Sequence, residues 1–370
     1  MVSESKLTVV QIVPEMHAGG VERGVMEVAA SLVARGHRSL VISGGGQLVT
    51  PLTQAGSEHI QWPVGKKSPL TLRWIWPLRR LLKEHQVDIV HVRSRVPAWL
   101  AWLAWRGMDP VTRPRYVTTM HGLHSVSRYS QIMTSGERVI AVSQALRTHI
   151  LENYPSTDPD KLVLIHRGVD KKDFPFGHQP DKTWLDAWYQ DYPKLKQAKV
   201  ITLAGRLTRL KGHATFLKLI ERLKTRYPDI HGLVVGGEDK RRQGYAQELY
   251  AEVAKKGLPI TFTGARSDIR EIYAVSDLVL SLSSRPESFG RTVLEALYLG
   301  RPVIGWDHGG VGEILADLLP EGRVKLDDLD GLVQRCDTFF SQAPTMKPVT
   351  RFSLQEMLDQ THALYHSMRR

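Results

Sequence analysis

The chain has 370 residues, of which 42% are hydrophobic and 24% are charged, and its formal net charge is +12 at pH 7. At about 150 residues per domain this length predicts roughly two domains, and the composition excludes a disordered chain. The single cysteine, Cys336, excludes an intramolecular disulfide and a cysteine-based metal cluster. No run of about 18 apolar residues is present, and the first residues are too polar for a signal peptide, so we expect a cytoplasmic protein with no membrane-spanning helix.

The basic residues are unevenly distributed along the chain. Residues 66–128 contain twelve lysines and arginines, only three acidic residues and five of the nine tryptophans. A local basic excess attracts polyanions, and nucleic acid, anionic lipid and phosphorylated glycans all fit that description.

In the first half of the chain, short apolar runs alternate with helical patterns. Residues 7–13 form the first predicted strand, and a helix follows the Gly19-Gly20 turn and ends near residues 35–37. Further strands are predicted at 40–42, 87–92, 116–119, 138–142 and 162–165. This alternation is typical of βαβ units in a parallel sheet.

The second half repeats the alternation after residue 199. Strands are predicted at 200–203, 232–235, 260–262, 278–281 and 302–304. Residues 171–197 contain three prolines and little periodicity, which predicts a linker. The fold class is therefore α/β, with two doubly wound domains that face each other across a cleft and bind ligands at the carboxyl ends of their strands.

Two loops follow predicted first strands and carry the chemistry of anion binding. Gly19-Gly20 lets backbone N–H groups approach a ligand at a helix start, although a plain tight turn explains it equally well. It lacks the G-x-G-x-x-G spacing, which disfavours a dehydrogenase. In the second loop Arg206 and Lys211 can clamp a diphosphate, or they are solvated loop residues.

Two carboxylates and one histidine complete the candidate residues. Glu287 precedes a predicted helix and Glu295 lies about two turns into it, so the pair can accept hydrogen bonds from hydroxyls at the two ends of an elongated ligand. The alternative is a capped helix with one solvated glutamate. His121 follows a predicted strand, where it can meet a ligand or serve the structure alone.

Together these residues closely resemble glycosyltransferase family 4, the retaining nucleotide-sugar enzymes of GT-B fold, and the resemblance runs over nearly the whole chain. Its most specific elements are the Glu-x7-Glu pattern from Glu287 to Glu295 and the Gly205-Arg206 and Lys211-Gly212 pairs. Weaker matches occur at 140–143, 167–170, 263–264 and 307–311. Arg167 stands where the family commonly has Asn, a departure that we expect to have little effect.

The resemblance implies a role for each matched residue. Arg206 and Lys211 would bind the donor diphosphate and stabilise it as the leaving group, and Glu295 would hold the ribose hydroxyls. Glu287, with the N–H groups of Phe289 and Gly290, would hold the sugar. The remaining implied donor contacts are His121 at the transferred sugar, Gly20 on the phosphate side and Arg266 at the base.

The resemblance also implies the domain roles. Residues 1–180 would bind the acceptor, residues 181–348 would bind the nucleotide-sugar, and residues 349–370 would form a helix that packs back towards the N-terminal domain. The scheme needs no metal, and the Asp158-Pro-Asp160 and Asp328-Leu-Asp330 strings lie in polar loops, so we interpret both as surface features. We therefore expect no metal and no cofactor beyond the nucleotide-sugar.

The basic, tryptophan-rich segment is the local guide to the acceptor. Residues 73–83 have the composition of an interfacial helix, and Trp99, Trp102 and Trp105 fall on one helical face, although both helices can simply pack on the sheet. An anionic glycolipid or polysaccharide, such as the lipopolysaccharide core, suits this segment, on the inner face of the cytoplasmic membrane. A nucleotide-sugar epimerase of the same fold and a nucleic-acid-binding protein are the alternatives. The two carboxylates disfavour the second, so we expect no nucleic-acid partner.

Overall fold

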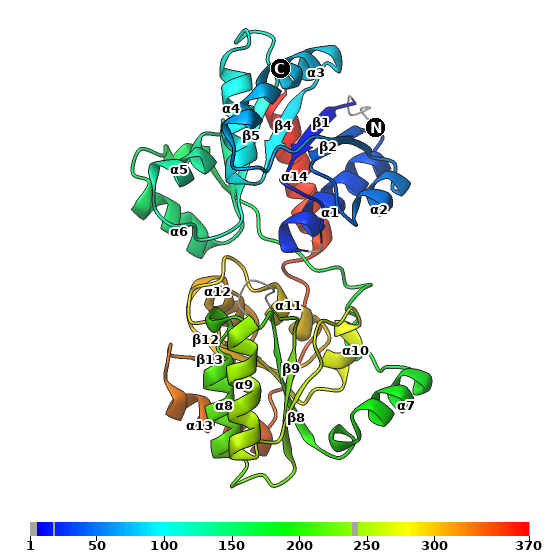
Figure 1. Ribbon diagram of the computed structural model, residues 1–370, viewed down its shortest axis with the longest axis vertical. Helices are drawn as coiled ribbons and strands as arrows, with labels where there is room; N and C mark the ends of the chain where they lie inside the picture. The colour runs from blue at the N-terminus through cyan, green and yellow to red at the C-terminus, as the bar shows by residue number, and fades with distance from the viewer. Residues whose placement is uncertain (1–5, 18, 239–242, 370) are drawn as a thin grey trace. The chain divides into compact units, whose positions relative to one another are not determined.

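The computed structural model describes residues 6–17, 19–238 and 243–369 and confirms the predicted α/β class. The chain divides into two units, each built around its own parallel sheet (Figure 1). Unit 1 comprises Met1–Arg167 and Gln355–Arg370, and unit 2 comprises Gly168–Leu354.

Unit 1 contains a seven-stranded parallel sheet in the order β3-β2-β1-β4-β5-β6-β7. Its strands are β1 (Thr8–Ile12), β2 (Arg38–Ser43), β3 (Glu58–Gln61), β4 (Ile89–Val92), β5 (Arg115–Met120), β6 (Arg138–Ala141) and β7 (Leu162–Leu164). The central strands are buried on both faces, which is why they were predicted from continuous apolar runs. β3 was not predicted, because this partly exposed edge strand has a single apolar residue, Ile60.

The helices of unit 1 include the predicted helix after Gly19, which is α1 and buries Val25, Val28, Ala29 and Leu32. The α-helices are α1 (Gly20–Ala34), α2 (Val49–Gln54), α3 (Ile75–Glu84), α4 (Arg95–Arg106), α5 (Arg128–Gln131), α6 (Gln144–Asn153) and α14 (Leu354–Met368). The short 3₁₀ helices are η1 (Pro69–Trp74), η2 (Ile132–Thr134) and η3 (Pro159–Lys161).

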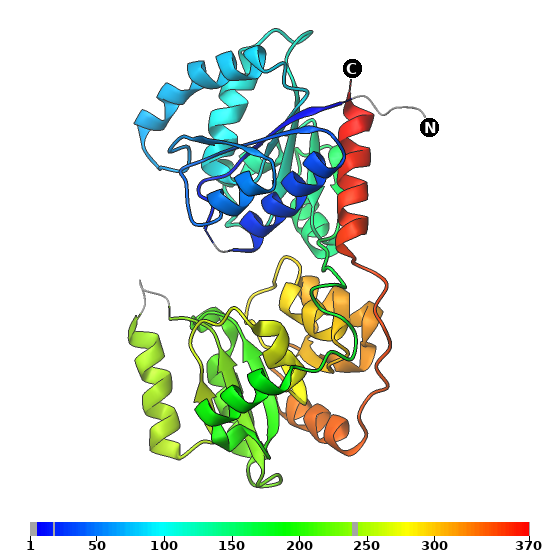
Figure 2. The same ribbon diagram turned by 90° about the vertical axis from the view of Figure 1, so that its right-hand side faces the viewer.

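The last helix, α14, packs on unit 1 although it follows all of unit 2 in the sequence (Figure 2). The Tyr365 hydroxyl lies 2.5 Å from His91 Nδ1 on β4, and Arg115 Nε on β5 donates to the carbonyl oxygen of Met368. Ser31 Oγ on α1 is 3.0 Å from His362 Nε2. The helix is therefore held to the sheet and to α1 by side chains far apart in sequence.

Unit 2 contains a six-stranded parallel sheet in the order β10-β9-β8-β11-β12-β13. Its strands are β8 (Lys199–Ala204), β9 (Ile230–Val235), β10 (Ile260–Phe262), β11 (Leu278–Ser281), β12 (Val303–Trp306) and β13 (Arg323–Val324). Its helices are α7 (Lys182–Asp191), η4 (Pro193–Leu195), η5 (Arg209–Lys211), α8 (His213–Leu223), α9 (Gln243–Lys256), α10 (Ile269–Ala274), α11 (Arg291–Tyr298), α12 (Gly309–Leu318), η6 (Pro320–Gly322) and α13 (Leu329–Ser341).

The first change of unit falls at Arg167–Gly168, before residue 180, and the second at Leu354–Gln355, after residue 348. Val169 forms a β-bridge with Ser353, and a Cβ on Gly168 would lie 2.3 Å from the Ser353 carbonyl oxygen. The two segments at which the chain passes from one unit to the other therefore pair with each other.

The predicted linker, residues 171–197, is instead partly folded. It forms α7 and η4, where Trp188 and Leu195 are buried in one apolar cluster with Val200 and Leu233. The prediction of an unstructured linker was wrong because it relied on the three prolines and overlooked the helical spacing of the apolar residues between them.

Candidate functional site

The order of strands in unit 2 reverses between β8 and β11, and in doubly wound sheets ligands bind at the carboxyl ends of strands at such a reversal. The loop after β8 carries Arg206 and Lys211, and the loop after β11 carries Glu287. Gly212 brings the two loops together: its φ is +78°, and a Cβ there would lie 2.0 Å from the Leu282 carbonyl oxygen. The fold thus sets two predicted residues side by side.

Lys211 and Glu287 form an ion pair at this edge. Lys211 Nζ donates to Glu287 Oε1 over 2.7 Å, and Ser283 Oγ donates to the same oxygen over 2.5 Å. The Glu287 side chain is only 22% exposed, and burial favours its neutral form, but the Lys211 charge and the two hydrogen bonds outweigh burial and lower the pKa of Glu287. The site therefore holds a carboxylate ready to accept hydrogen bonds from hydroxyls.

The start of α12 supports the Glu287 loop. Gly310 N donates to the Glu287 carbonyl oxygen over 2.8 Å, and His308 Nε2 lies 2.9 Å from the Ser283 carbonyl oxygen. A Cβ on Gly309, whose φ is +57°, would lie 2.7 Å from the Glu287 carbonyl oxygen. The glycines of the 307–311 motif thus allow close packing against the carboxylate loop.

Three further predicted residues differ in their exposure. Arg206 is exposed on the loop after β8, and within the described ranges no carboxylate lies within ion-pair distance of it. Phe289 is buried, with its ring 6.1 Å from that of Phe352, and Gly290 has a φ of +101° at the start of α11. Arg206 is accessible to a ligand, whereas the Phe289 side chain is part of the core.

Glu295 lies within α11, where it is buried and paired. Its Oε1 accepts a hydrogen bond from Arg291 Nε over 2.9 Å, one helical turn earlier. The charges of Glu295 and Glu287 both add to burial in raising the pKa of Tyr273 well above its usual value, so both carboxylates act on one buried tyrosine. Arg291 was not among the predicted residues, although the i, i+4 spacing from Glu295 signals the pair.

Arg266 follows β10, two strands away from β8 in the sheet order. Both its Nε and Nη2 donate to the Asp268 carboxylate, at 2.9 and 2.6 Å, and its guanidinium lies 5.5 Å from the Trp188 ring centroid. The hydrogen bonds to Asp268 raise the pKa of Arg266. This guanidinium is held in a fixed position near an aromatic surface.

In unit 1 the structure brings His121 and Gly20 together through Arg167. Arg167 Nη2 lies 2.8 Å from His121 Nδ1 after β5, and Nη1 donates to the Gly20 carbonyl oxygen over 2.7 Å. A Cβ on Gly24 would lie 2.5 Å from Nη1, so the glycine makes room for this guanidinium. The Arg167 side chain thus links two predicted site residues far apart in sequence, and the expectation that this departure has little effect on function stays a prediction.

The environment of His121 keeps the imidazole neutral. Burial lowers its pKa well below the usual value, and the charges of Arg167 and Arg93 lower it further. A guanidinium can only donate hydrogen bonds, so Nδ1 of His121 is the acceptor and Nε2 carries the proton. His121 therefore carries an N–H group at the buried Nε2 and is uncharged near neutral pH.

No group of three His, Cys, Asp or Glu side chains within residues 6–17, 19–238 and 243–369 is placed to hold a metal ion. The two Asp-x-Asp strings serve helix starts, since Asp158 accepts a hydrogen bond from Asp160 N and Asp328 from Gly331 N. Among the described residues, no helix is long and apolar enough to cross a membrane.

Two family models match the chain, one on each half. Residues 18–173 match glycosyltransferase family 4, and residues 186–342 match glycosyl transferases group 1. A glycosyltransferase from Rickettsia africae ESF-5 is 32% identical, with 99% of both chains covered and a TM-score of 0.88.

More distant relatives share the fold or part of the sequence. HepE from Anabaena, solved in complex with UDP and glucose, is 19% identical over 98% of this chain and all of its own, with a TM-score of 0.82. The lipopolysaccharide core biosynthesis mannosyltransferase LpsB of Rhizobium meliloti is 28% identical over 58% of this chain and 62% of its own. The chain spans 64%, 55% and 60% of the first three curated relatives that it matches.

Proposed function

The chain belongs to glycosyltransferase family 4 and has the GT-B fold, and we propose that it transfers a sugar from a nucleotide diphosphate sugar to a glycan hydroxyl with retention of configuration. The proposed donor is a UDP-sugar. The proposed acceptor is a lipopolysaccharide core or a related envelope glycan, and the reaction requires no metal.

One observation carries the proposal, the Lys211–Glu287 pair at the strand reversal of unit 2. A diphosphate beside Lys211 receives a charge-assisted hydrogen bond, and Arg206, exposed on the same loop, supplies a second cation. Glu287 is ionised and accepts hydrogen bonds from sugar hydroxyls. Cation and carboxylate side by side fit the junction between the phosphate and the sugar of one donor.

The proposed reaction takes place on one face of the sugar. The bond from the anomeric carbon to the departing phosphate oxygen breaks, and that oxygen takes the proton of the incoming acceptor hydroxyl as the new bond forms on the same face. Lys211 and Arg206 stabilise the negative charge that develops on the diphosphate. Glu287 and the Nε2 proton of His121 are proposed to orient the sugar, and neither forms a covalent bond to it.

Two of the relatives support the proposed donor and acceptor classes. HepE, which shares the fold, was crystallised with UDP and glucose, which favours a UDP-sugar donor. The partial match to a lipopolysaccharide core mannosyltransferase favours an envelope glycan. An acceptor of this kind carried on a lipid would require the protein to work at the inner face of the cytoplasmic membrane.

Unit 1 has a surface that fits membrane association. Leu70 and Leu72 are 71% and 49% exposed on η1, with Lys66 and Lys67 just before this helix. Basic residues near an anionic leaflet each contribute roughly 1 kcal/mol, and exposed leucines can bury apolar area in the interface. We propose that this surface gives reversible, salt-dependent membrane binding.

Release of free nucleotide tests the proposed activity. The protein is incubated with UDP-, GDP- and ADP-sugars, with and without lipopolysaccharide core acceptor, and the nucleotide is quantified. We expect acceptor-dependent release of UDP, abolished or strongly reduced in Lys211→Ala and unchanged in Lys218→Ala, an exposed α8 control. Release of no nucleotide from any donor would refute the proposal.

A further inference from the structure

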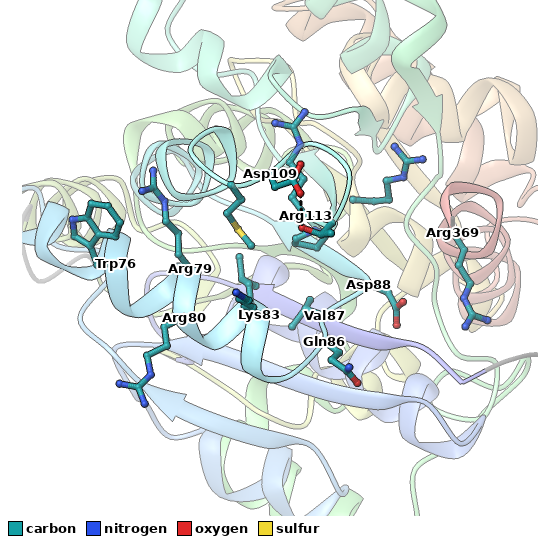
Figure 3. Close-up of a pocket in the computed structure, with 15 residues that line it drawn as sticks. Trp76, Arg79, Arg80, Lys83, Gln86, Val87, Asp88, Asp109, Arg113 and Arg369 are labelled. Atoms are coloured by element: carbon teal, nitrogen blue, oxygen red, sulfur yellow. Dashed lines mark hydrogen bonds between the residues drawn. The ribbon is translucent and has the colours of Figure 1, made fainter.

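A pocket of about 920 Å³ lies wholly within unit 1, between α3, the loop after α4 and the end of α14 (Figure 3). It is at the amino ends of the strands, since Asp88 directly precedes β4 and Arg115 is the first residue of β5. His121 follows the other end of β5, and six steps of about 3.3 Å place it roughly 20 Å away. The pocket is therefore separate from the candidate site.

The pocket is lined by six cationic and two acidic side chains. The cations are Arg79, Arg80, Lys83, Arg113, Arg115 and Arg369. The two acids already accept hydrogen bonds from the protein: Asp88 Oδ2 from Thr8 N over 2.7 Å, and Asp109 Oδ1 from Val111 N over 2.9 Å. Positive charge therefore dominates the pocket.

Three of the six cations are available to a ligand. Arg80 pairs with Glu84 and Arg115 with Glu137, while Arg79 donates to two backbone carbonyl oxygens of α4. In contrast, no carboxylate among the described residues lies within ion-pair distance of the other three, which are Lys83, Arg113 and Arg369.

Arg113 is the most constrained of these three cations. Its guanidinium stacks 3.5 Å from the Trp105 ring centroid, and its buried Nε has no hydrogen-bond partner among the described residues. A buried guanidinium N–H without an acceptor is costly, and an anion that enters the pocket can supply one.

The remaining lining suits a sugar ring rather than a bare ion. Leu82, Val87, Met108 and Pro114 form an apolar part of the wall. Trp76 lies at the rim, largely exposed, with the Arg79 guanidinium 4.6 Å from its ring centroid. An exposed indole offers a flat amphipathic surface on which a sugar can stack, and pockets of roughly 300–1,000 Å³ hold small ligands.

We propose that this pocket is a second saccharide site, which binds a phosphorylated sugar. Lys83, Arg113 and Arg369 bind the phosphate, and Trp76 packs on the sugar ring. The ligand is either a free sugar phosphate that regulates the protein or a phosphorylated sugar within a longer acceptor. This second site shares no residue with the loops after β8 and β11 on which the proposed function rests.

Calorimetric titration of the full chain tests the site without any turnover. Glucose 6-phosphate, inorganic phosphate and glucose are the probes, and we expect saturable binding of glucose 6-phosphate, weaker binding of phosphate and none of glucose. Lys83→Glu and Arg369→Glu each reverse an exposed charge and should weaken glucose 6-phosphate binding by about tenfold or more, whereas the exposed loop control Lys347→Glu should not. Absence of saturable binding up to about 10 mM, or equal binding by all variants, would overturn the proposal.

Transfer kinetics then distinguish the two sources of the ligand. If the phosphorylated sugar belongs to the acceptor, Lys83→Glu raises KM for the acceptor, leaves kcat unchanged, and free glucose 6-phosphate competes with the acceptor. If a free sugar phosphate is the ligand, it changes the rate of the wild type and not of Lys83→Glu. If the wild-type protein releases no nucleotide from any donor, the proposed function is refuted, whereas the binding measured by calorimetry is unaffected.

Discussion

Replacing Lys211 with Met removes one cation from the loop after β8 and nearly preserves the side-chain volume. In the wild type, the 2.7 Å charge-assisted hydrogen bond from Lys211 to Glu287 contributes about 1.5–3 kcal/mol of stabilisation. If Lys211 donates a bond of this strength to the departing diphosphate, turnover should fall about 10- to 150-fold. Initial rates of nucleotide release, with Lys218→Met as an exposed control on α8, measure this loss.

The same substitution should change how stability depends on pH. In the wild type the pKa of Glu287 lies below its ordinary 4.5, so the pair stabilises the fold above that value and its contribution is lost as the pH falls through the lowered pKa. Without Lys211, burial is the largest remaining influence on Glu287, so we expect the pKa of Glu287 to rise and its ionisation to become destabilising as the pH rises. Urea unfolding should therefore show a difference in the free energy of unfolding between wild type and Lys211→Met. This difference should be largest at neutral pH and should shrink as the pH falls through the lowered pKa of Glu287.

A double mutant separates the structural from the catalytic effect. Lys211→Met with Glu287→Gln leaves no buried unpaired charge, so part of the lost stability should return while turnover stays low. A folded Lys211→Met protein with wild-type turnover would refute the assignment of Lys211 to the leaving group. A stability gap that is constant from acid to neutral pH would refute the account of the ion pair.

Three other predictions concern separate parts of the molecule. Glu295→Ala should weaken nucleotide binding in calorimetry more than Glu295→Gln, which keeps an acceptor for Arg291; unchanged affinity in both would contradict the ribose assignment. Gly24→Ala should displace the Arg167 guanidinium and raise the pKa of His121 in an NMR titration, whereas the control Gly244→Ala should not. The free energy of unfolding should stay within about 1 kcal/mol of wild type in both variants. An unshifted His121 pKa in Gly24→Ala would contradict the packing argument. The protein should sediment with anionic but not neutral vesicles, less so at high salt and less so in Leu70→Ser; equal recovery in the supernatant throughout would exclude membrane binding.

The strands of both sheets other than β3 and β13 were predictable because parallel strands covered on both faces are continuous apolar runs. β3 was missed because only Ile60 is apolar in that exposed edge strand. The helix of residues 182–191 was missed because the three prolines of the expected linker suggested an irregular segment. Two of these prolines precede the helix and one follows it, so none interrupts it.

Candidate site residues could be selected from the sequence where one loop or one helix carries the pattern, as with Lys211 or the Glu287 to Glu295 spacing. Contacts between distant segments were not. Arg167 and His121 are 46 residues apart, and no local sequence pattern indicates that the Arg167 guanidinium forms a hydrogen bond with the His121 ring. Which carboxylates form ion pairs also depends on packing between segments, as the Lys211–Glu287 pair, 76 residues apart in sequence, shows.

The anomeric configuration of the product shows whether the sugar is transferred on one face with the leaving-group oxygen as the base. The wild-type protein is incubated with a UDP-sugar and lipopolysaccharide core acceptor in EDTA, and the new linkage is read from the anomeric proton coupling in the NMR spectrum. Transfer by way of the leaving-group oxygen, without metal, predicts a product with the configuration of the donor. An inverted product, or no transfer until a divalent cation is added, would contradict the account.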